Sequence, residues 1–588
     1  MLHHELETQL KAAVAAVLPD ADLSTVLVRP CPDPKFGDYQ ASALMAIGKA
    51  RKANPRQLAT QVLEKLDVSQ WCEPVEIAGP GFLNFRLKNA ALNEAMNRVA
   101  QADQIVASTT APRTVVVDFS SPNVAKPMHV GHIRSTGIGD ALQRVLRLLG
   151  HRVITDNHLG DWGTQFGKLL VGWKEILDRA ALEADPIAEL ERLYKIINTE
   201  CDANEERLKQ AQQELVKLQA GDAENVAIWQ EMARLSQGQF DTLYGRLGVK
   251  FDQTLGESFY NPWLAPVVAD LQAKGIARES EGAVAVFSDG SLPPKEDPFL
   301  VNRDGEWVAD PALIRKSDGG FNYMTTDLAT IDYRLKTWSP DEIVYVVDDR
   351  QAPHFKKLFL TFARWQPEAA KRVKLRHVGF GKILGDDGRP FKTRSGDTVK
   401  LSDLLDEAEE RALKVVAEKN PSLSESEQAE IARVVGLGAV KYADLAPNRQ
   451  TDYVFNWDKM LAFQGNTAPY LQYAYTRIRS IFRKATEEGI TVSSGAQINA
   501  VEPDELALAK HLLNFSLTLE YVIEDYRPNY LCAYLYELAT FVSRFWENCP
   551  VLKSDEPQRS SRLKLCELAG RVLKEGLNAL GIEVLEQM

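Results

Sequence analysis

The chain has 588 residues, of which 45% are hydrophobic and 26% charged, and its formal net charge is −12. These values are ordinary for a globular protein of roughly three to five domains, and no apolar run is long enough to cross a membrane, so we expect no membrane partner. The acidic total excludes a simple basic coat protein for nucleic acid, although it leaves room for a local basic surface. The six cysteines are scattered without C-x2-C spacing, which predicts reduced core thiols, no disulfide and no metal ligands.

The N-terminal segment, residues 1–110, has the pattern of a separate α/β unit. Apolar residues every three or four positions predict an amphipathic helix at its start, where Lys11 and several acids interrupt the apolar part. We therefore expect no secretory signal and a cytoplasmic location. Short strand-like runs follow at 24–29, 74–79 and 82–87.

The segment 111–400 begins with the pattern of a nucleotide-binding fold. The apolar run Val115–Val117 ends in a polar loop, as a buried parallel strand does. A helix is expected at 131–150, ended by Gly150, and a second strand at 151–160. This β-α-β order predicts a doubly wound, Rossmann-type parallel sheet.

Two helical regions accompany that sheet. Charged helical pattern at about 170–250 predicts an insertion, after which strand-like runs resume at 282–287 and 342–349. Beyond residue 400 we expect only helices: a connecting region at 401–462 and a bundle at 463–588. The predicted helices run over 402–418, 425–442, 466–487, 503–522, 529–547 and 558–578.

The strongest local signal is the sequence SSPNVAKPMHVGHIRS at 120–135. A buried strand ends in a loop, and His129 and His132 then open a helix. A helix N-terminus carries unpaired N–H groups and partial positive charge, so it suits a phosphate. The imidazoles could donate hydrogen bonds to phosphate oxygens, and Gly131 would leave room for a nucleotide ring or sugar. A metal site is the alternative for H-x-x-H, but no third ligand is evident nearby.

The segment SPNVAKPMHVGH resembles the HIGH motif of class I aminoacyl-tRNA synthetases, in the form typical of arginyl-tRNA synthetases. The resemblance implies that His129 and His132 stabilise the phosphates of ATP and that Lys126 shares this role. It also places Pro122 and Gly131 at the ATP. The second motif of the class, a basic KMSKS loop, is absent from the chain.

An altered version of that basic loop is the segment FKTRSG at 391–396, which resembles the loop of many arginyl enzymes. The resemblance implies that Lys392 and Arg394 neutralise the β- and γ-phosphates and that Ser395 contacts ATP. A solvated hairpin tip is the alternative interpretation of this pattern. Because pyrophosphate is the leaving group of adenylation, Mg2+ is expected together with ATP.

The amino acid substrate requires acceptors, because a guanidinium is planar and carries five donors. The resemblance implies that Glu257 and Asp327 face the two cationic ends of arginine, and that Asn123, Tyr323 and Gln351 orient the rest. Tyr323 and Asp327 are four residues apart and share one face of a helix. Which carboxylate takes which end stays open.

The C-terminal bundle carries aromatic and basic residues at alternating positions, which suit stacking on single-stranded bases and contact with phosphates. An amphipathic core helix with a basic outer face is the alternative. The stretch resembles the start of the family's anticodon-binding domain, which implies that tRNA contacts Tyr470, Tyr473, Arg477, Trp546 and Met588.

The resemblance extends over the whole chain. It implies an N-terminal added domain that approaches the tRNA elbow, with Phe82 and Asn84 at the D-loop. The implied reaction is ATP-dependent activation of L-arginine and transfer to the 3′ end of tRNA(Arg), with activation dependent on bound tRNA. The alternatives are another class I synthetase, a small nucleotidylyltransferase or an inactive RNA-binding relative. We expect a monomer, because no exposed heptad seam is evident.

Overall fold

The structure is a computed structural model, and it describes residues 2–385, 387–389, 391, 399–491 and 495–588. The predicted loop residues Lys392, Arg394 and Ser395 lie outside the described residues. In the part of the chain that is described, no helix is long and apolar enough to cross a membrane.

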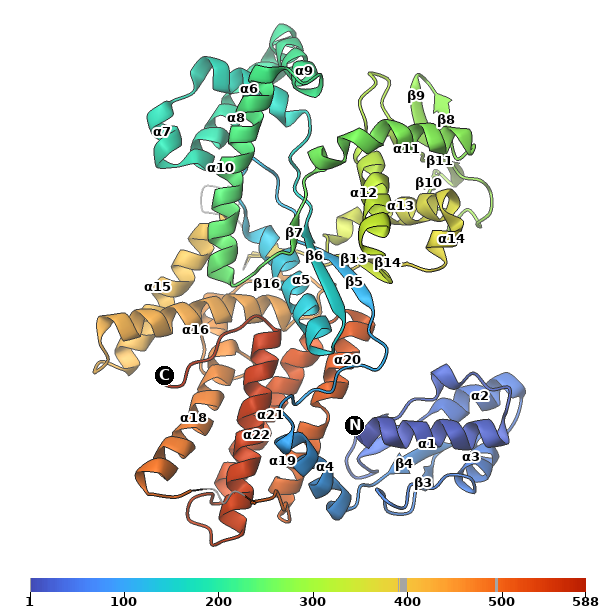
Figure 1. Cartoon of the computed structure of the whole chain (residues 1–588), viewed down its shortest axis with the longest axis vertical. Coiled ribbons are helices and arrows are strands. Elements are labelled where there is room, and N and C mark those ends of the chain that lie inside the picture. The colour runs from blue at the N-terminus through green and yellow to red at the C-terminus, as the bar shows by residue number, and fades with distance from the viewer. Residues whose placement is uncertain (1, 386, 390, 392–398, 492–494) are drawn as a thin grey trace.

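The N-terminal unit contains an antiparallel sheet of order β1-β2-β4-β3, accompanied by α1 to α3 (Figure 1). The strand expected at 24–29 is mostly wrong, because Asp22 accepts a hydrogen bond from the Ser24 backbone and starts a single 3-10 turn, η1 (Leu23–Thr25). The other elements are α1 (Leu2–Val17), β1 (Arg29–Pro30), β2 (Tyr39–Ala41), α2 (Ala43–Arg51), α3 (Pro55–Leu63), β3 (Glu76–Ala78), β4 (Phe82–Phe85) and the outgoing α4 (Asn89–Gln101).

The central sheet is parallel throughout and has the order β14-β13-β5-β6-β7. Helix α5 crosses from β5 to β6 and packs so closely that a Cβ at Gly139 would lie 2.2 Å from the ring of Phe119. The expected Rossmann-type sheet is confirmed. The elements are β5 (Thr114–Asp118), α5 (Val130–Leu148), β6 (Arg152–Asn157), β7 (Gln253–Thr254), β13 (Glu342–Tyr345) and β14 (Lys374–His377).

Two additions extend beyond the sheet, on the side opposite the C-terminal bundle (Figure 1). The first is the expected helical insertion, with α6 (Gln165–Ile176), α7 (Arg179–Ala184), α8 (Pro186–Ala203), α9 (Glu205–Gln219) and α10 (Ala223–Leu247). The second contains η2 (Glu257–Tyr260), α11 (Asn261–Ala273), β8 (Ala277–Ser280), β9 (Ala283–Val286), β10 (Leu300–Arg303), β11 (Glu306–Ala309), β12 (Ala312–Arg315), α12 (Tyr323–Trp338), η3 (Asp349–Gln351), α13 (Ala352–Trp365) and α14 (Pro367–Ala370).

The C-terminal part is helical, as expected, with two differences. The helix predicted at 503–522 is broken at Asn514, whose side chain accepts a hydrogen bond from the Tyr39 hydroxyl at 3.0 Å. A short parallel strand pair also joins β15 (Ile383–Leu384) to β16 (Tyr453–Val454). The helices are α15 (Leu401–Lys419), α16 (Glu425–Leu445), α17 (Trp457–Met460), α18 (Ala468–Glu487), α19 (Pro503–Leu513), α20 (Phe515–Asp525), α21 (Asn529–Asn548) and α22 (Gln558–Ala579).

Candidate functional site

The loop between β5 and α5 is held in an unusual backbone conformation. Ser120, Ser121 and Ala125 have φ angles of 72°, 49° and 61°, in the left-handed region that non-glycine residues rarely adopt. Helix α10 fixes this loop, because the Ser120 hydroxyl lies 2.8 Å from the Tyr244 hydroxyl and the Ala125 backbone donates to Ser236 Oγ at 2.9 Å. The helical insertion therefore supports the strained loop that leads into the site.

The two histidines cap the start of α5 reciprocally. Nδ1 of His129 accepts from the backbone of Gly131, and Nδ1 of His132 accepts from the backbone of His129, both at 3.0 Å. A neutral imidazole that accepts at Nδ1 carries its proton on Nε2. Both rings therefore have an N–H donor left over, and among the described residues neither Nε2 has a hydrogen-bond partner.

The role expected of Gly131 changes with this geometry. A Cβ at that position would lie 2.9 Å from Cε1 of His129. The glycine is therefore needed by the cap itself, and any role in leaving room for a nucleotide is additional. The ring centroids of the two histidines lie 4.0 Å apart, which keeps their free Nε2–H groups on one small patch.

Both imidazoles are neutral at pH 7. Burial, together with the neighbouring His129, lowers the pKa of His132 to about 3. Burial also lowers the pKa of His129, and Arg350 adds to the effect. The donors offered to an anion are therefore neutral N–H groups, not imidazolium cations.

The far end of the predicted basic loop is attached to the same helix start. The Val130 backbone donates to the Val399 carbonyl at 2.9 Å, and the Leu401 backbone donates to the Met128 carbonyl at 2.9 Å. Residue 399 is the first described residue after the FKTRSG segment. The loop thus rejoins the described fold beside His129, which is where a cation acting on the same phosphates would have to come from.

Three further residues expected at the site lie on the loop before the histidines. The Pro122 carbonyl accepts from the Gly160 backbone at 3.1 Å, and the exposed Asn123 bridges to the same residue. The Lys126 ammonium lies 5.1 Å from the ring centroid of Tyr194 on α8. The cation of Lys126 is therefore held by an aromatic face near the helix start.

The residues expected to bind arginine lie on three elements. Asp327 on α12 makes a 2.6 Å contact with Nε2 of His354 on α13, and the ring of Tyr323 lies 4.7 Å from that imidazole. Gln351 is exposed at the N-cap of α13. The structure thus brings Tyr323 and Asp327 together, with His354 as a partner that the sequence pattern does not reveal.

Glu257 lies on η2, and the pKa of its carboxyl group is close to neutral pH. Burial, together with the charges of Asp327 and Asp161, raises its pKa to about 7, although His158 opposes this shift. A cation between Glu257 and Asp327 would favour the ionised form of Glu257. The pair therefore suits a ligand with positive charge.

Two further polar residues have environments that the sequence does not reveal. Nδ1 of His158, after β6, is buried without a hydrogen-bond partner among the described residues. Arg334 on α12 is fully buried and pairs with Asp118 at 2.6 Å and with Asp156 at 2.8 Å. Both carboxylates lie at the carboxyl end of the sheet, so this pairing fixes α12 and its Asp327 over that edge.

Three of the residues expected to bind tRNA form one group on the bundle. The Arg477 guanidinium lies 4.8 Å from the ring of Trp546 and 5.9 Å from that of Tyr473. Tyr470 is half-buried, with its ring 5.8 Å from Tyr536. Met588 lies apart from this group and packs against a small apolar cluster on α15 and α16.

The two residues expected at the N-terminal tRNA surface differ in exposure. Phe82 is half-buried, whereas Asn84 is only 3% exposed and its oxygen accepts from Gln40 at 2.8 Å. A direct contact of Asn84 with tRNA would require this buried side chain to become exposed. Its side chain is better placed to position Gln40, which is half-buried on the neighbouring strand.

Comparison with known proteins agrees with this site. Residues 94–457 match the family of class I (R) tRNA synthetase catalytic domains, residues 471–588 the DALR anticodon-binding domain, and residues 4–87 the arginyl-tRNA synthetase N-terminal domain. An arginine–tRNA ligase of Chromobacterium violaceum is 46% identical over 591 residues, with 100% of both chains covered. One of Shigella boydii is 46% identical over 590 residues, with 99% of each covered.

Solved structures give the same result. Arginyl-tRNA synthetase of Plasmodium falciparum matches with a TM-score of 0.82 and 28% identity, and that of Thermus thermophilus with 0.84 and 25%. Both matches cover 100% of this chain, and 99% and 100% of the other. The parallel sheet and the histidine-capped helix are those of a class I aminoacyl-tRNA synthetase. Within that class, the chain belongs to the arginyl-tRNA synthetase family.

Proposed function

We propose that the histidine-capped start of α5 and the carboxylates of η2 and α12 form one active site, in which arginine is adenylated. The chain is an arginine–tRNA ligase, which joins L-arginine to tRNA at the expense of ATP. The observation that supports this placement is the pair of Nε2–H donors that the reciprocal cap leaves without a partner among the described residues, beside the end of the basic loop.

Two successive nucleophilic displacement reactions are assigned to the site. An oxygen of the arginine carboxylate attacks the α-phosphorus of ATP, and the bond from that phosphorus to the bridging oxygen breaks, releasing pyrophosphate. A terminal ribose hydroxyl of tRNA then attacks the activated carbonyl and displaces AMP. His129 and His132 donate to phosphate oxygens as negative charge builds up, and Lys126, Lys392 and Arg394 add positive charge. Catalysis is by positioning and charge stabilisation, with no covalent enzyme intermediate.

ATP makes further contacts with Pro122, Gly131 and Ser395 in this proposal. Mg2+ enters with ATP, since triphosphate oxygens are the hard ligands it prefers, and when bound it neutralises charge on the leaving pyrophosphate. No side chain of the chain is assigned to it.

Arginine lies between Glu257 and Asp327, with Asn123, Tyr323 and Gln351 around it. Two competitive ligands decide which carboxylate binds which end: citrulline, which lacks the guanidinium charge, and 5-guanidinovalerate, which lacks the α-amino group. When the carboxylate that binds the guanidinium is changed to its amide, binding of 5-guanidinovalerate should weaken and binding of citrulline should stay unchanged. Equal effects of Asp327→Asn and Glu257→Gln on both ligands would contradict a two-ended assignment.

The remaining assignments concern tRNA(Arg). We assign residues 1–110 to the tRNA elbow, 111–400 to catalysis, 401–462 to the connection and 463–588 to the anticodon, and a cytoplasmic monomer is the working unit. The group Tyr473, Arg477 and Trp546 supports an anticodon surface, since a cation between aromatic faces suits unstacked bases. Tyr470, Met588 and Phe82 complete the proposed contacts.

The experiment that tests this function is charging of total bacterial tRNA with each amino acid in turn. Arginine alone should be attached, and pyrophosphate exchange should require tRNA. Attachment of another amino acid would contradict the assignment of the arginine pocket but not that of the fold. Exchange without tRNA would contradict only the tRNA requirement.

A further inference from the structure

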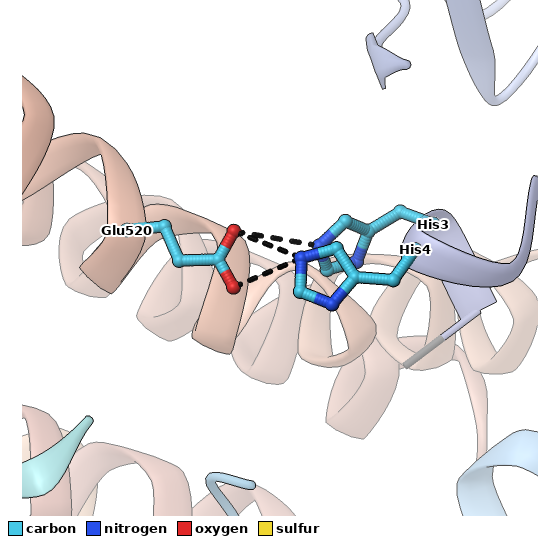
Figure 2. Close-up of side chains that lie close together, drawn as sticks. All are labelled: His3, His4 and Glu520. Carbon is cyan, nitrogen blue, oxygen red and sulfur yellow. Dashed lines mark hydrogen bonds and ion pairs between the residues drawn. The ribbon is translucent and has the colours of Figure 1, made fainter. Parts of the chain in front are cut away.

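A cluster of three side chains lies far from the active site, where the N-terminal unit meets the C-terminal bundle. His3 and His4, in the first turn of α1, both face Glu520 on α20 (Figure 2). Nε2 of His4 lies 3.1 and 3.2 Å from the two carboxylate oxygens, and Nε2 of His3 lies 3.7 Å from one of them. The three ligand atoms all lie within 4.8 Å of one another.

Nε2 of His3 is buried, and its ion-pair partner Glu520 lies beyond hydrogen-bond distance at 3.7 Å. The residue is 2% exposed, and its Nε2 has no hydrogen-bond partner among the described residues. A buried polar atom without a partner is costly, so such an atom usually points to a missing proton, water or ion.

The geometry fits a tetrahedral transition metal. Zinc binds imidazole nitrogen and carboxylate oxygen at about 2.0 to 2.2 Å, so two ligands of one tetrahedral ion lie about 3.4 Å apart. The distances from one carboxylate oxygen, Oε2 of Glu520, to Nε2 of His4 and of His3 are 3.2 and 3.7 Å, which bracket that value. His4 is 48% exposed at its side chain, which gives an ion a route from solvent and leaves a coordination position for water.

We propose that His3, His4 and Glu520 form a binding site for a divalent transition metal of the Zn2+ type, with water as the fourth ligand. Two imidazoles and one carboxylate are a ligand set that zinc accepts, and hard cations such as Mg2+ disfavour it. The ion would cross-link α1 to α20, and so clamp the N-terminal unit onto the bundle. The prediction of no metal rested on cysteine spacing, which says nothing about adjacent histidines whose third ligand lies 516 residues away.

The same interface provides a matched control. Glu524, one turn further along α20, pairs with Arg29 of the N-terminal unit at 3.2 Å. Changing it to glutamine removes an ionic contact between the same two parts of the chain and leaves the proposed ligands intact. A loss specific to Glu520→Gln therefore reports ligation and not weaker docking of the two units.

The test uses the full-length chain without an affinity tag, because a histidine tag would itself bind zinc. Equilibrium dialysis should find one Zn2+ per chain in the parent protein and in Glu524→Gln. In His4→Ala and Glu520→Gln the affinity should fall at least about tenfold. Co2+ in place of Zn2+ should give the absorption bands of a tetrahedral ion without a thiolate charge-transfer band.

Three results would overturn the proposal. They are no stoichiometric zinc in the parent chain, binding that Glu520→Gln leaves unchanged, and a thiolate band that points to cysteine ligands. A thermal shift gives a second readout, since Zn2+ should raise the Tm of the parent chain and of Glu524→Gln but not that of Glu520→Gln. If zinc has no effect and Tm varies only with pH, the cluster is a histidine–carboxylate ion pair and the metal site is wrong.

Discussion

The start of α5 uses two imidazoles where most helices use a hydroxyl or a carboxylate. Each Nδ1 satisfies a backbone N–H of the first turn, and each Nε2 keeps a proton for a ligand. A phosphate at this position receives two side-chain donors together with the helix N-terminus. The sequence predicted the donors, but the cap and the tautomer that it fixes became visible only in the structure, because histidine is not a usual capping residue.

Glu257 makes arginine binding sensitive to pH. Its pKa of about 7 means that below this value the free enzyme holds a proton there, and arginine, a cation, must displace it. We expect KM for arginine to rise as the pH falls from 8 to 6, approaching about tenfold per pH unit well below the pKa. Glu257→Gln should bind arginine weakly and flatten the profile. A KM that is constant with pH in the parent enzyme would contradict this role.

At the scale of elements, α12 connects substrate recognition to the sheet. Asp327 and Arg334 are seven residues apart and share one helix face, so the ion pairs of Arg334 with Asp118 and Asp156 set the height of Asp327 above the sheet edge. Helix ends came close to prediction wherever a glycine, proline or capping residue marked them. The break at Asn514 was missed, and the Tyr39 hydroxyl that contacts Asn514 lies 475 residues away in the sequence.

Arg334→Met should be strongly destabilising. It leaves two carboxylates buried without a cation, which costs about 3 to 5 kcal/mol in the free energy of unfolding. Lys336→Met, on the same helix, breaks only the exposed pair with Asp332 and should change stability by less than about 1 kcal/mol. Urea denaturation measures both. Equal stability of the two variants would show that the buried pairs do not anchor α12.

At the scale of the whole molecule, α5 is connected directly to the C-terminal helices. Arg134, two residues after His132, is 1% exposed, and its Nε lies 3.0 Å from Asp444 on α16. Its Nη1 donates to the carbonyls of Gly381 and Thr451. One guanidinium thus joins the histidine-capped helix, the segment before the basic loop and the helical region.

Arg134→Lys should keep the charge and lose that three-way connection. We expect ATP–pyrophosphate exchange to slow by about tenfold or more, because small displacements of catalytic groups have large effects on rate. Arg147→Lys, on the same helix with an exposed partner, Asp252, serves as the control and should be nearly unchanged. Equal rates in both variants would mean that Arg134 has a structural role only.

The bundle surface allows a separate test of tRNA binding. Arg477→Ala should raise KM for tRNA about tenfold, since base stacking and cation contacts contribute about 1 to 3 kcal/mol each, and it should leave KM for ATP unchanged. Arg479, on the same helix, is already paired with Glu586 at 2.6 Å. Arg479→Ala should therefore have the smaller effect, and the reverse order would contradict the proposed surface.

Much of the architecture could be predicted from local pattern. Patterns of residues within about 20 positions of one another are enough to predict the strand at Val115–Val117, the glycine-ended helix after it and the charged insertion. What could not be predicted depends on contacts between distant residues. His354 reaches Asp327 across two helices, and Arg334 reaches Asp118 over 216 residues. The spacing of residues along the sequence does not predict such contacts.

The most direct test of the central claim is His132→Asn. The side-chain oxygen of asparagine can occupy the place of Nδ1 and accept from the His129 backbone, but its shorter side chain has no donor at the place of Nε2. If this donor stabilises the transition state of adenylation, the variant should keep the Tm of the parent enzyme and lose about 100-fold to 1,000-fold in pyrophosphate exchange with tRNA present. A variant that folds normally and exchanges at the parent rate would contradict the assignment of the active site to the start of α5.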